Sequence, residues 1–267
     1  MNNPSRDTHL LHVMAFNTSV HYFSSFSKMH FDNGSPFKLS FLLLCEEKPA
    51  MIEEMKEFGY DVHWIKYDYE KRKAQMFSVY RKVKKLFKQI QPTIVHTNLF
   101  EDAMICQRAA YKLKIKGRVH TKQCTGFHYF NAPKGMKYDR WINNWATHLV
   151  SVSEESMEFL LEKELAPKDK IRLIHHGIDF KLLTSASDPE VAEIKSTFNL
   201  EGKLVLGTVA RYIAWKRYVD LIAAFKIVKE KYPNAVFLGV GNGAQETELR
   251  KLIEDEGLQD SFVLTGW

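Results

Sequence analysis

Leu204-Val-Leu-Gly-Thr-Val-Ala-Arg-Tyr-Ile-Ala-Trp-Lys216 is the stretch around which the rest of the sequence is interpreted. Its first half is an apolar run rich in Val and Leu, which is typical of a parallel strand buried on both faces. Its second half carries Arg211 and Lys216 and leads into an amphipathic helical pattern. Cations between the end of a strand and the start of a helix favour an anion site, usually for phosphate. A solvated surface turn with Lys216 and Arg217 facing water fits equally well, so this stretch alone leaves both interpretations open.

The composition is that of an ordinary globular protein with a surplus of positive charge. Of the 267 residues, 45% are hydrophobic and 26% are charged, and the formal net charge is +6. This surplus favours an acidic partner such as nucleotide phosphates, an anionic lipid surface or nucleic acid. Basic residues cluster within 71–73, 81–82 and 84–88, a pattern that also fits the solvated face of one helix.

The cysteines and the apolar segments bear on the compartment. Cys45, Cys106 and Cys124 are scattered and odd in number, without the spacing of a disulfide framework or a zinc site. We therefore expect a cytoplasmic protein that holds no metal. No window approaches the roughly 20 apolar residues of a membrane span. The amino terminus lacks the apolar core of a signal peptide, so any contact with the inner face of a membrane would be peripheral.

Short apolar runs alternate with helical patterns along the chain. The first part predicts a doubly wound parallel sheet, because strands that alternate with helices form βαβ units. Residues 181–202 are more polar, and the pattern then restarts. Strands are predicted at 10–16, 38–44, 62–67, 93–97, 117–121, 147–152, 171–174, 204–209, 236–240 and 262–264. Helices are predicted at 49–58, 74–90, 101–113, 138–146 and 246–256, with one more after the N-cap Ser153 and another ending at Lys231.

Four stretches carry recognisable motifs in a fixed order: Ile174-His-His-Gly-Ile-Asp179, Gly207-Thr-Val-Ala-Arg-Tyr-Ile-Ala-Trp-Lys216, Gly239-Val-Gly-Asn-Gly243 and Val263-Leu-Thr-Gly-Trp267. Together they resemble the family 4 retaining glycosyltransferases, most clearly over residues 93–267. The resemblance implies an α/β fold of the GT-B type, with two Rossmann-like doubly wound domains. Residues 1–180 would form the N-terminal acceptor-binding domain. Residues 181–267 would form a partial C-terminal domain that binds the nucleotide-sugar donor.

The same resemblance implies a donor site in the second domain. Arg211 and Lys216 match the pair of cations that hold the donor diphosphate, and two fixed cations would stabilise the charge that builds as this group leaves. Gly241 and Gly243 match a tight turn whose backbone passes near the nucleotide. A turn without any ligand also fits these glycines.

A histidine that approaches the sugar is often present in this family. His120 and His128 are both candidates, and we choose His128 as catalytic because it lies in the loop after the strand at 117–121, expected to face the cleft between the domains. A surface histidine without a role fits His128 as well. His96 lies inside a predicted strand and is interpreted as a packed side chain. His175 and His176 replace the family's Pro-Asn, and no chemistry is assigned to them.

The sequence departs from the family pattern at two places. Asn17-Thr-Ser-Val-His21 contains no glycine where the family has a glycine-rich loop after the first strand. The Glu-x7-Glu element, which contacts the donor sugar and ribose, comes in the family after the strand that here precedes Trp267. We therefore expect a truncated chain with an incomplete second domain.

The resemblance predicts a retaining hexosyltransferase-type enzyme that moves a sugar from a nucleotide-sugar donor to a saccharide or lipid-linked acceptor, as in polysaccharide biosynthesis. The donor is a substrate, and no cofactor, metal or nucleic-acid partner is expected. Two alternatives remain: a GT-B nucleotide-sugar epimerase, and a non-catalytic or degenerate GT-B nucleotide-binding protein. A dinucleotide oxidoreductase is disfavoured, because the glycines from Gly239 to Gly243 lack the required spacing. The basic helix at 74–90 would suit an anionic membrane surface.

Overall fold

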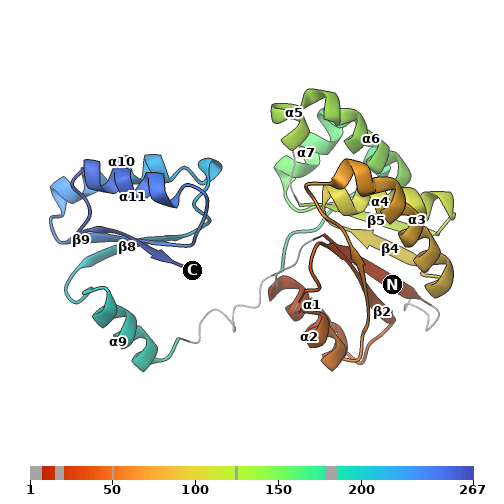
Figure 1. Cartoon of the computed structure of the whole chain (residues 1–267), viewed down its shortest axis with the longest axis horizontal. Helices are drawn as coiled ribbons and strands as arrows, with labels where there is room; N and C mark the ends of the chain where they lie inside the picture. Colours follow the sequence, from red (N-terminus) through yellow and green to blue (C-terminus); the bar gives the residue numbers. More distant parts are fainter. Residues whose placement is uncertain (1–7, 16–20, 50, 124–125, 178–185) are drawn as a thin grey trace. The chain divides into compact units, whose positions relative to one another are not determined.

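The computed structural model describes residues 8–15, 21–49, 51–123, 126–177 and 186–267. The chain divides into two compact units, residues 1–179 and 180–267. Each unit is built on its own parallel β-sheet with packed helices (Figure 1). The units are described separately below.

The first unit contains a seven-stranded sheet in the order β3-β2-β1-β4-β5-β6-β7, with every neighbouring pair parallel. The strand order runs outward in both directions from the β1–β4 pair, which makes this pair the topological switch point of a doubly wound fold. The strands are β1 (His9–Met14), β2 (Lys38–Cys45), β3 (Asp61–Lys66), β4 (Ile94–Thr97), β5 (Gly117–Lys122), β6 (His148–Ser151) and β7 (Ile171–Leu173).

Helices cover both faces of this sheet (Figure 1). On one face, α3 and α4 pack Val83, Phe87 and Ile105 against the strand residues Leu11 and Leu42. On the other face, α2 packs against a second cluster of strand side chains. The helices of this unit are α1 (His21–Asp32), α2 (Met51–Glu57), α3 (Arg72–Ile90), α4 (Phe100–Lys112), α5 (Phe127–Asn131), α6 (Met136–Trp145) and α7 (Glu154–Glu162).

The start of α7 confirms one prediction at atomic detail. The hydroxyl of Ser153 accepts a hydrogen bond from the backbone amide of Ser156 at 3.1 Å, so Ser153 is the N-cap. Glu154 and Glu155 occupy the first turn, where negative charge complements the helix dipole. The α1 and α5 helices, in contrast, were not predicted.

The second unit has a three-stranded parallel sheet in the order β10-β9-β8. Its core is rich in aromatic rings, with Phe237 and Phe262 stacked at a centroid distance of 4.4 Å. Ile222 and Phe225 of α10 pack into this core, as the spacing of apolar residues predicted, whereas Val219 is exposed. Its elements are α9 (Asp188–Thr197), β8 (Leu204–Val209), α10 (Tyr218–Lys231), β9 (Ala235–Val240), α11 (Glu246–Asp255) and β10 (Phe262–Gly266).

The burial predicted for the strand at 204–209 is wrong. β8 lies at the edge of its sheet, and Val205 and Val209 are 43% and 83% exposed. Only the face that carries Leu206 packs on the core with α10 and α11. The polar stretch at 181–202 contains the helix α9, which was not predicted.

Candidate functional site

The loops that follow the three strands of the second unit are joined by hydrogen bonds. The amide of Tyr212, after β8, donates to the carbonyl of Asn242, after β9, at 2.8 Å, and the amide of Gln245 donates back to Tyr212 at 3.1 Å. The amide of Gly241 donates to the carbonyl of Gly266 at the end of β10 at 2.9 Å. The carboxyl ends of the three parallel strands therefore meet in one connected set of loops.

The two predicted phosphate ligands belong to this edge of the sheet. Arg211 lies two residues after the end of β8, and Lys216 ends the short 3-10 helix at Ala214–Lys216. Both side chains are exposed, and neither forms an ion pair with any residue that the structure describes. Arg217 differs from them, because it adopts a left-handed backbone conformation (φ 56°) and forms an ion pair with Asp220. Two cations without an ion-pair partner among the described residues thus lie between the end of β8 and the start of α10.

The two glycines of the turn have a structural reason to be glycine. A Cβ atom on Gly241, which has φ 152°, would lie 2.1 Å from the carbonyl oxygen of Ala210. A Cβ on Gly243 would lie 2.4 Å from the carbonyl oxygen of Tyr212. The close approach of the two loops therefore requires both glycines without any ligand, and a role in nucleotide binding stays a prediction.

His128 belongs to the first unit and lies in the five-residue helix α5, whereas the sequence suggested a loop. Its Nδ1 atom is 2.6 Å from Oδ2 of Asp139, which is on α6. The rings of Phe100 and Phe127 meet the imidazole edge-on, at centroid distances of 4.6 and 5.5 Å. The side chain is 14% exposed, so it is not completely closed off from solvent.

His120, the alternative candidate, is a buried side chain of the β5 strand, and its Nδ1 lies 3.0 Å from the hydroxyl of Thr97. His96 on β4 is packed, as predicted, and its Nε2 lies 2.7 Å from the hydroxyl of Thr121. Burial lowers the pKa of His96 to about 4, and it lowers the pKa values of His12 and His120 well below the ordinary value for histidine. These histidines are therefore neutral members of the sheet.

This histidine cluster predicts acid sensitivity of the first unit. The unfolded chain protonates these rings near pH 6.5 and the folded chain does not, so their stabilising contribution is complete above pH 6.5 and falls towards pH 4. Replacing His96 by Gln should remove about 2 kcal/mol of the stability change that urea unfolding measures between pH 7 and 5. Burial raises the pKa of Asp102, which acts in the opposite direction, so the comparison with unmodified protein isolates the effect of His96. An unchanged slope would contradict this account.

Several other positions named in the sequence analysis form no part of a candidate site in the described structure. His175 is exposed, and its Nδ1 lies 3.1 Å from the carbonyl oxygen of Val152. Residues 16–20, 124–125 and 178–185 lie outside the described residues, and they include most of the glycine-free segment, Cys124 and the Ile-Asp at the end of the first motif. Among the described residues, Cys45 and Cys106 are buried and unpaired, and no group of His, Cys, Asp or Glu is arranged to hold a metal.

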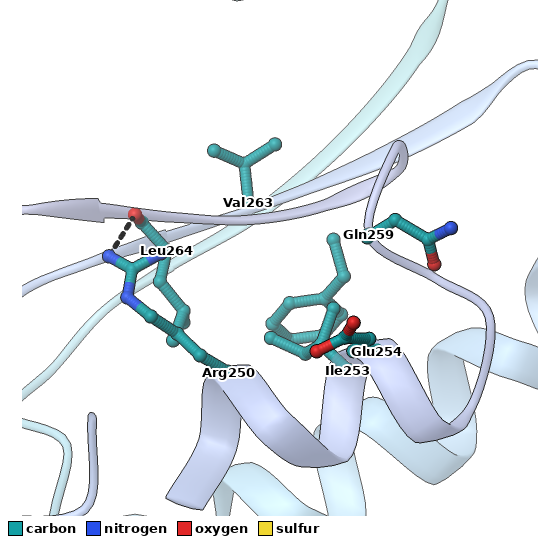
Figure 2. Close-up of a pocket in the computed structure, with 7 residues that line it drawn as sticks. Arg250, Ile253, Glu254, Gln259, Val263 and Leu264 are labelled. Carbon is teal, nitrogen blue, oxygen red and sulfur yellow. Dashed lines mark hydrogen bonds between the residues drawn. The ribbon is translucent and has the colours of Figure 1, made fainter. Parts of the chain in front are cut away.

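The cavities in the described parts of the chain include one in each unit. One, of about 310 Å³, lies between α11 and β10 and holds none of the predicted site residues; Figure 2 shows Arg250 at its side, donating to the carbonyl of Leu264. The other, of about 210 Å³, lies at the carboxyl ends of the β1, β2 and β3 strands. Its polar lining consists of two tyrosines and two carboxylates, Tyr67, Tyr69, Glu46 and Glu101.

Sequence reasoning missed Asp139, the partner of His128. A signal for it was present, because Asp139 lies three residues before Ile142, at the helical spacing of neighbours on the apolar side of α6. A carboxylate at such a position is expected to be buried and therefore to need a partner. No pattern in the sequence named that partner.

Comparison with protein families matches both units. The model described as Glycosyltransferase Family 4 matches residues 39–182, more than half of the chain. The model described as Glycosyl transferases group 1 matches residues 190–267. The described helices include none long and apolar enough to cross a membrane.

Curated relatives are similar at low identity. The putative glycosyltransferase EpsD of Bacillus subtilis is 23% identical over 202 residues, which cover 72% of this chain and 52% of EpsD. The 2-deoxystreptamine glucosyltransferase of Streptomyces kanamyceticus is 27% identical over 131 residues, which cover 48% of this chain and 34% of that enzyme. The chain thus matches about a third to a half of the length of these relatives.

Solved structures share the fold. The Anabaena HepE complex with UDP-glucose has a TM-score of 0.75 at 14% identity, with 97% of this chain and 69% of that chain covered. The UDP-GlcNAc 2-epimerase of Neisseria meningitidis, bound to UDP-GlcNAc, has a TM-score of 0.66 at 13% identity, with coverages of 96% and 72%.

Proposed function

The chain belongs to glycosyltransferase family 4, and we propose that the whole protein transfers a sugar from a nucleotide-sugar donor to a saccharide or lipid-linked acceptor. The two Rossmann-like α/β units of the chain are those of a GT-B protein. We propose that this transfer retains the configuration of the sugar. In this reaction the anomeric carbon loses the diphosphate as an acceptor oxygen bonds on the same face. The acceptor proton leaves with the diphosphate.

The observation that carries the proposal is the presence after β8 of two cations that form no ion pair with any described residue. Arg211 and Lys216 are held beside a loop whose backbone is fixed by hydrogen bonds to its neighbours. Fixed cations suit a leaving diphosphate, because they stabilise the charge that develops on it. HepE forms complexes with UDP and with UDP-glucose, so UDP-sugars are the first donors to test.

His128 is proposed as the residue of the first unit that approaches the transferred sugar. The cavity of about 210 Å³ is proposed for the acceptor, because tyrosine rings and carboxylates suit a polyhydroxylated ligand without negative charge. The two sites adjoin along the chain: Phe100 contacts the His128 ring, and the next residue, Glu101, lines the cavity.

The experiment offers UDP-glucose, UDP-galactose and UDP-GlcNAc to the full-length protein and follows UDP release and products by NMR. Transfer or slow hydrolysis with UDP release and a product of unchanged anomeric configuration is the expected result. An epimerised UDP-sugar without UDP release would favour the alternative suggested by the likeness to a 2-epimerase. UDP binding without any turnover would favour a non-catalytic nucleotide-binding protein.

Peripheral contact with an anionic membrane is proposed for the helix α3. Between Arg72 and Ile90 it contains no Asp or Glu, and Phe77 on its outer side is 71% exposed with Arg81 over its ring. The exposed cations of α3 form no ion pair within the described residues. An exposed aromatic ring among cations is typical of helices that lie at a membrane interface.

The membrane proposal predicts salt-sensitive binding to phosphatidylcholine vesicles that contain phosphatidylglycerol, and none to phosphatidylcholine alone. Replacing Arg81 and Lys85 by Gln should weaken this binding about 30-fold, because each basic residue contributes about 1 kcal/mol near an anionic surface. Replacing Lys203 and Lys231 by Gln, the same charge change in the second unit, is the control. Co-sedimentation that does not distinguish the two variants would exclude α3 as the contact.

A further inference from the structure

A buried charged cluster joins four elements of the first unit around His128. Lys122 ends β5, and its Nζ atom lies 3.0 Å from Oδ1 of Asp139 on α6 and 2.8 Å from Oε1 of Glu164, just after α7. The other oxygen of Asp139 meets His128 at 2.6 Å. The other oxygen of Glu164 accepts a hydrogen bond from the Asn143 amide at 2.8 Å.

The side chains of this cluster are almost entirely removed from water. Lys122, Asp139 and Glu164 are 7%, 9% and 2% exposed. Buried charges are costly unless they are paired and hydrogen-bonded. Here the one ammonium group bridges two carboxylates, and each carboxylate oxygen has its own partner. The cluster is therefore a fixed arrangement, held at once by β5, α5, α6 and the end of α7.

The cluster constrains the ring of His128 chemically. An ionised carboxylate only accepts hydrogen bonds, so the Nδ1 atom that faces Asp139 must carry a proton. In the neutral imidazole the other nitrogen, Nε2, then has a free lone pair. Among the described residues, Nε2 makes no hydrogen bond. A lone pair on an atom that has no hydrogen-bond partner among the described residues suits a hydroxyl donor from a ligand.

Packing constrains the same ring sterically. Phe100 and Phe127 meet it edge-on. Gly135 lies against its Cδ2 edge so closely that an added Cβ would come within 2.4 Å of Cδ2. A purely structural role would explain the ion pairs of Lys122 with Asp139 and Glu164, and any hydrogen-bond donor would satisfy the second oxygen of Asp139. It does not require that this donor be an imidazole held in one orientation by Phe100, Phe127 and Gly135.

We infer that Asp139 is a positioning residue for His128: it fixes the imidazole in the Nδ1–H tautomer and directs the Nε2 lone pair to a sugar hydroxyl, while Lys122 and Glu164 hold Asp139 in place. The inference rests on the proposed function only in assigning the hydroxyl to a sugar. The tautomer and orientation follow from the contacts alone.

The first test measures the tautomer directly and needs no activity. Long-range ¹H–¹⁵N NMR of the protein labelled at histidine should show His128 as the Nδ1–H tautomer at pH 7.5, with its signal assigned by loss in His128→Gln. Asp139→Asn should shift His128 towards the Nε2–H form. Asp169→Asn, the same change at an exposed residue of the first unit, should leave the signal unchanged. An Nε2–H tautomer in the unmodified protein would overturn the inference, even if the Asp139 variant failed to fold.

The second test separates positioning from folding by kinetics. With UDP-glucose as the probe, Asp139→Asn should lower kcat about 10- to 100-fold, a part of the 10²–10⁴-fold that a positioned acid or base contributes. The KM for UDP-glucose should change little, and Asp139→Glu should recover part of kcat. Equal loss in both variants together with a raised KM would indicate a structural role. If the unmodified protein consumes no UDP-sugar, the proposed function fails while the tautomer result still decides the inference.

Discussion

Replacing Arg211 and Lys216 together by Ala is expected to weaken binding of UDP to the full-length protein by about 10²–10⁴-fold, because hydrogen bonds to charged groups contribute about 1.5–3 kcal/mol each. Both side chains are exposed and unpaired within the described residues, so their removal leaves no buried partner behind. The loss should therefore appear in affinity and not in stability. Isothermal titration calorimetry with UDP measures it, and thermal unfolding provides the check on stability.

The matched control for this pair is Lys203→Ala. Lys203 is exposed and immediately precedes β8, whereas Arg211 follows the same strand at its other end. If the diphosphate binds at the carboxyl edge of the sheet, Lys203→Ala should leave the affinity for UDP unchanged. If UDP bound equally well to the Arg211 and Lys216 double variant, the assignment of the donor site to this edge would have to be abandoned.

Gly241→Ala is expected to destabilise the second unit by about 3–5 kcal/mol, since overpacking costs about 1–3 kcal/mol and a disallowed backbone conformation a similar amount. The added Cβ would meet the carbonyl oxygen of Ala210 at 2.1 Å, and backbone hydrogen bonds tie the loop that contains Gly241 to Tyr212 and Gly266. The loops would have to separate to admit a methyl group. Urea unfolding monitored by amide signals of the second unit measures the change.

Gly257→Ala is the control that separates crowding from backbone strain. Gly257 also has a positive φ, 67°, but nothing lies within 4 Å of an added Cβ. This variant should cost only about 1–2 kcal/mol, the price of a left-handed conformation. Equal losses of unfolding free energy in the two variants would show that the close contact with Ala210 does not contribute to the destabilisation by Gly241→Ala.

The order of most strands and helices could be predicted from the sequence, because the periodicity of apolar residues depends on local secondary structure. The bounds predicted for β8, residues 204–209, are the bounds observed, but the burial predicted for that strand is wrong. Burial of both faces depends on which elements pack against the sheet, and the composition of the strand does not contain that information. The helix α9 was missed although its signal was present: Ser187 and Glu190 form a capping box, with Pro189 in the first turn.

The candidate site was predictable only where a motif carries it. Arg211 and Lys216 were identified by their place in such a motif, and their positions at the strand end follow from local chain order. Asp139, Lys122 and Glu164 are far apart in the sequence, and their meeting depends on how α6 and α7 pack beside β5. Ion pairs between distant segments produce no regular spacing of residues along the chain, so they cannot be predicted from a single sequence.

The hydrogen bonds between the loops after β8, β9 and β10 have a kinetic consequence. The backbone around Arg211 is tied to Asn242 and Gln245 before any ligand arrives, so capture of a diphosphate requires no ordering of that segment. Such a preorganised receptor should associate at the rate of diffusional encounter, raised by its positive charge and lowered by salt. Differences in affinity between nucleotides would then come from their dissociation rates and not from their association rates.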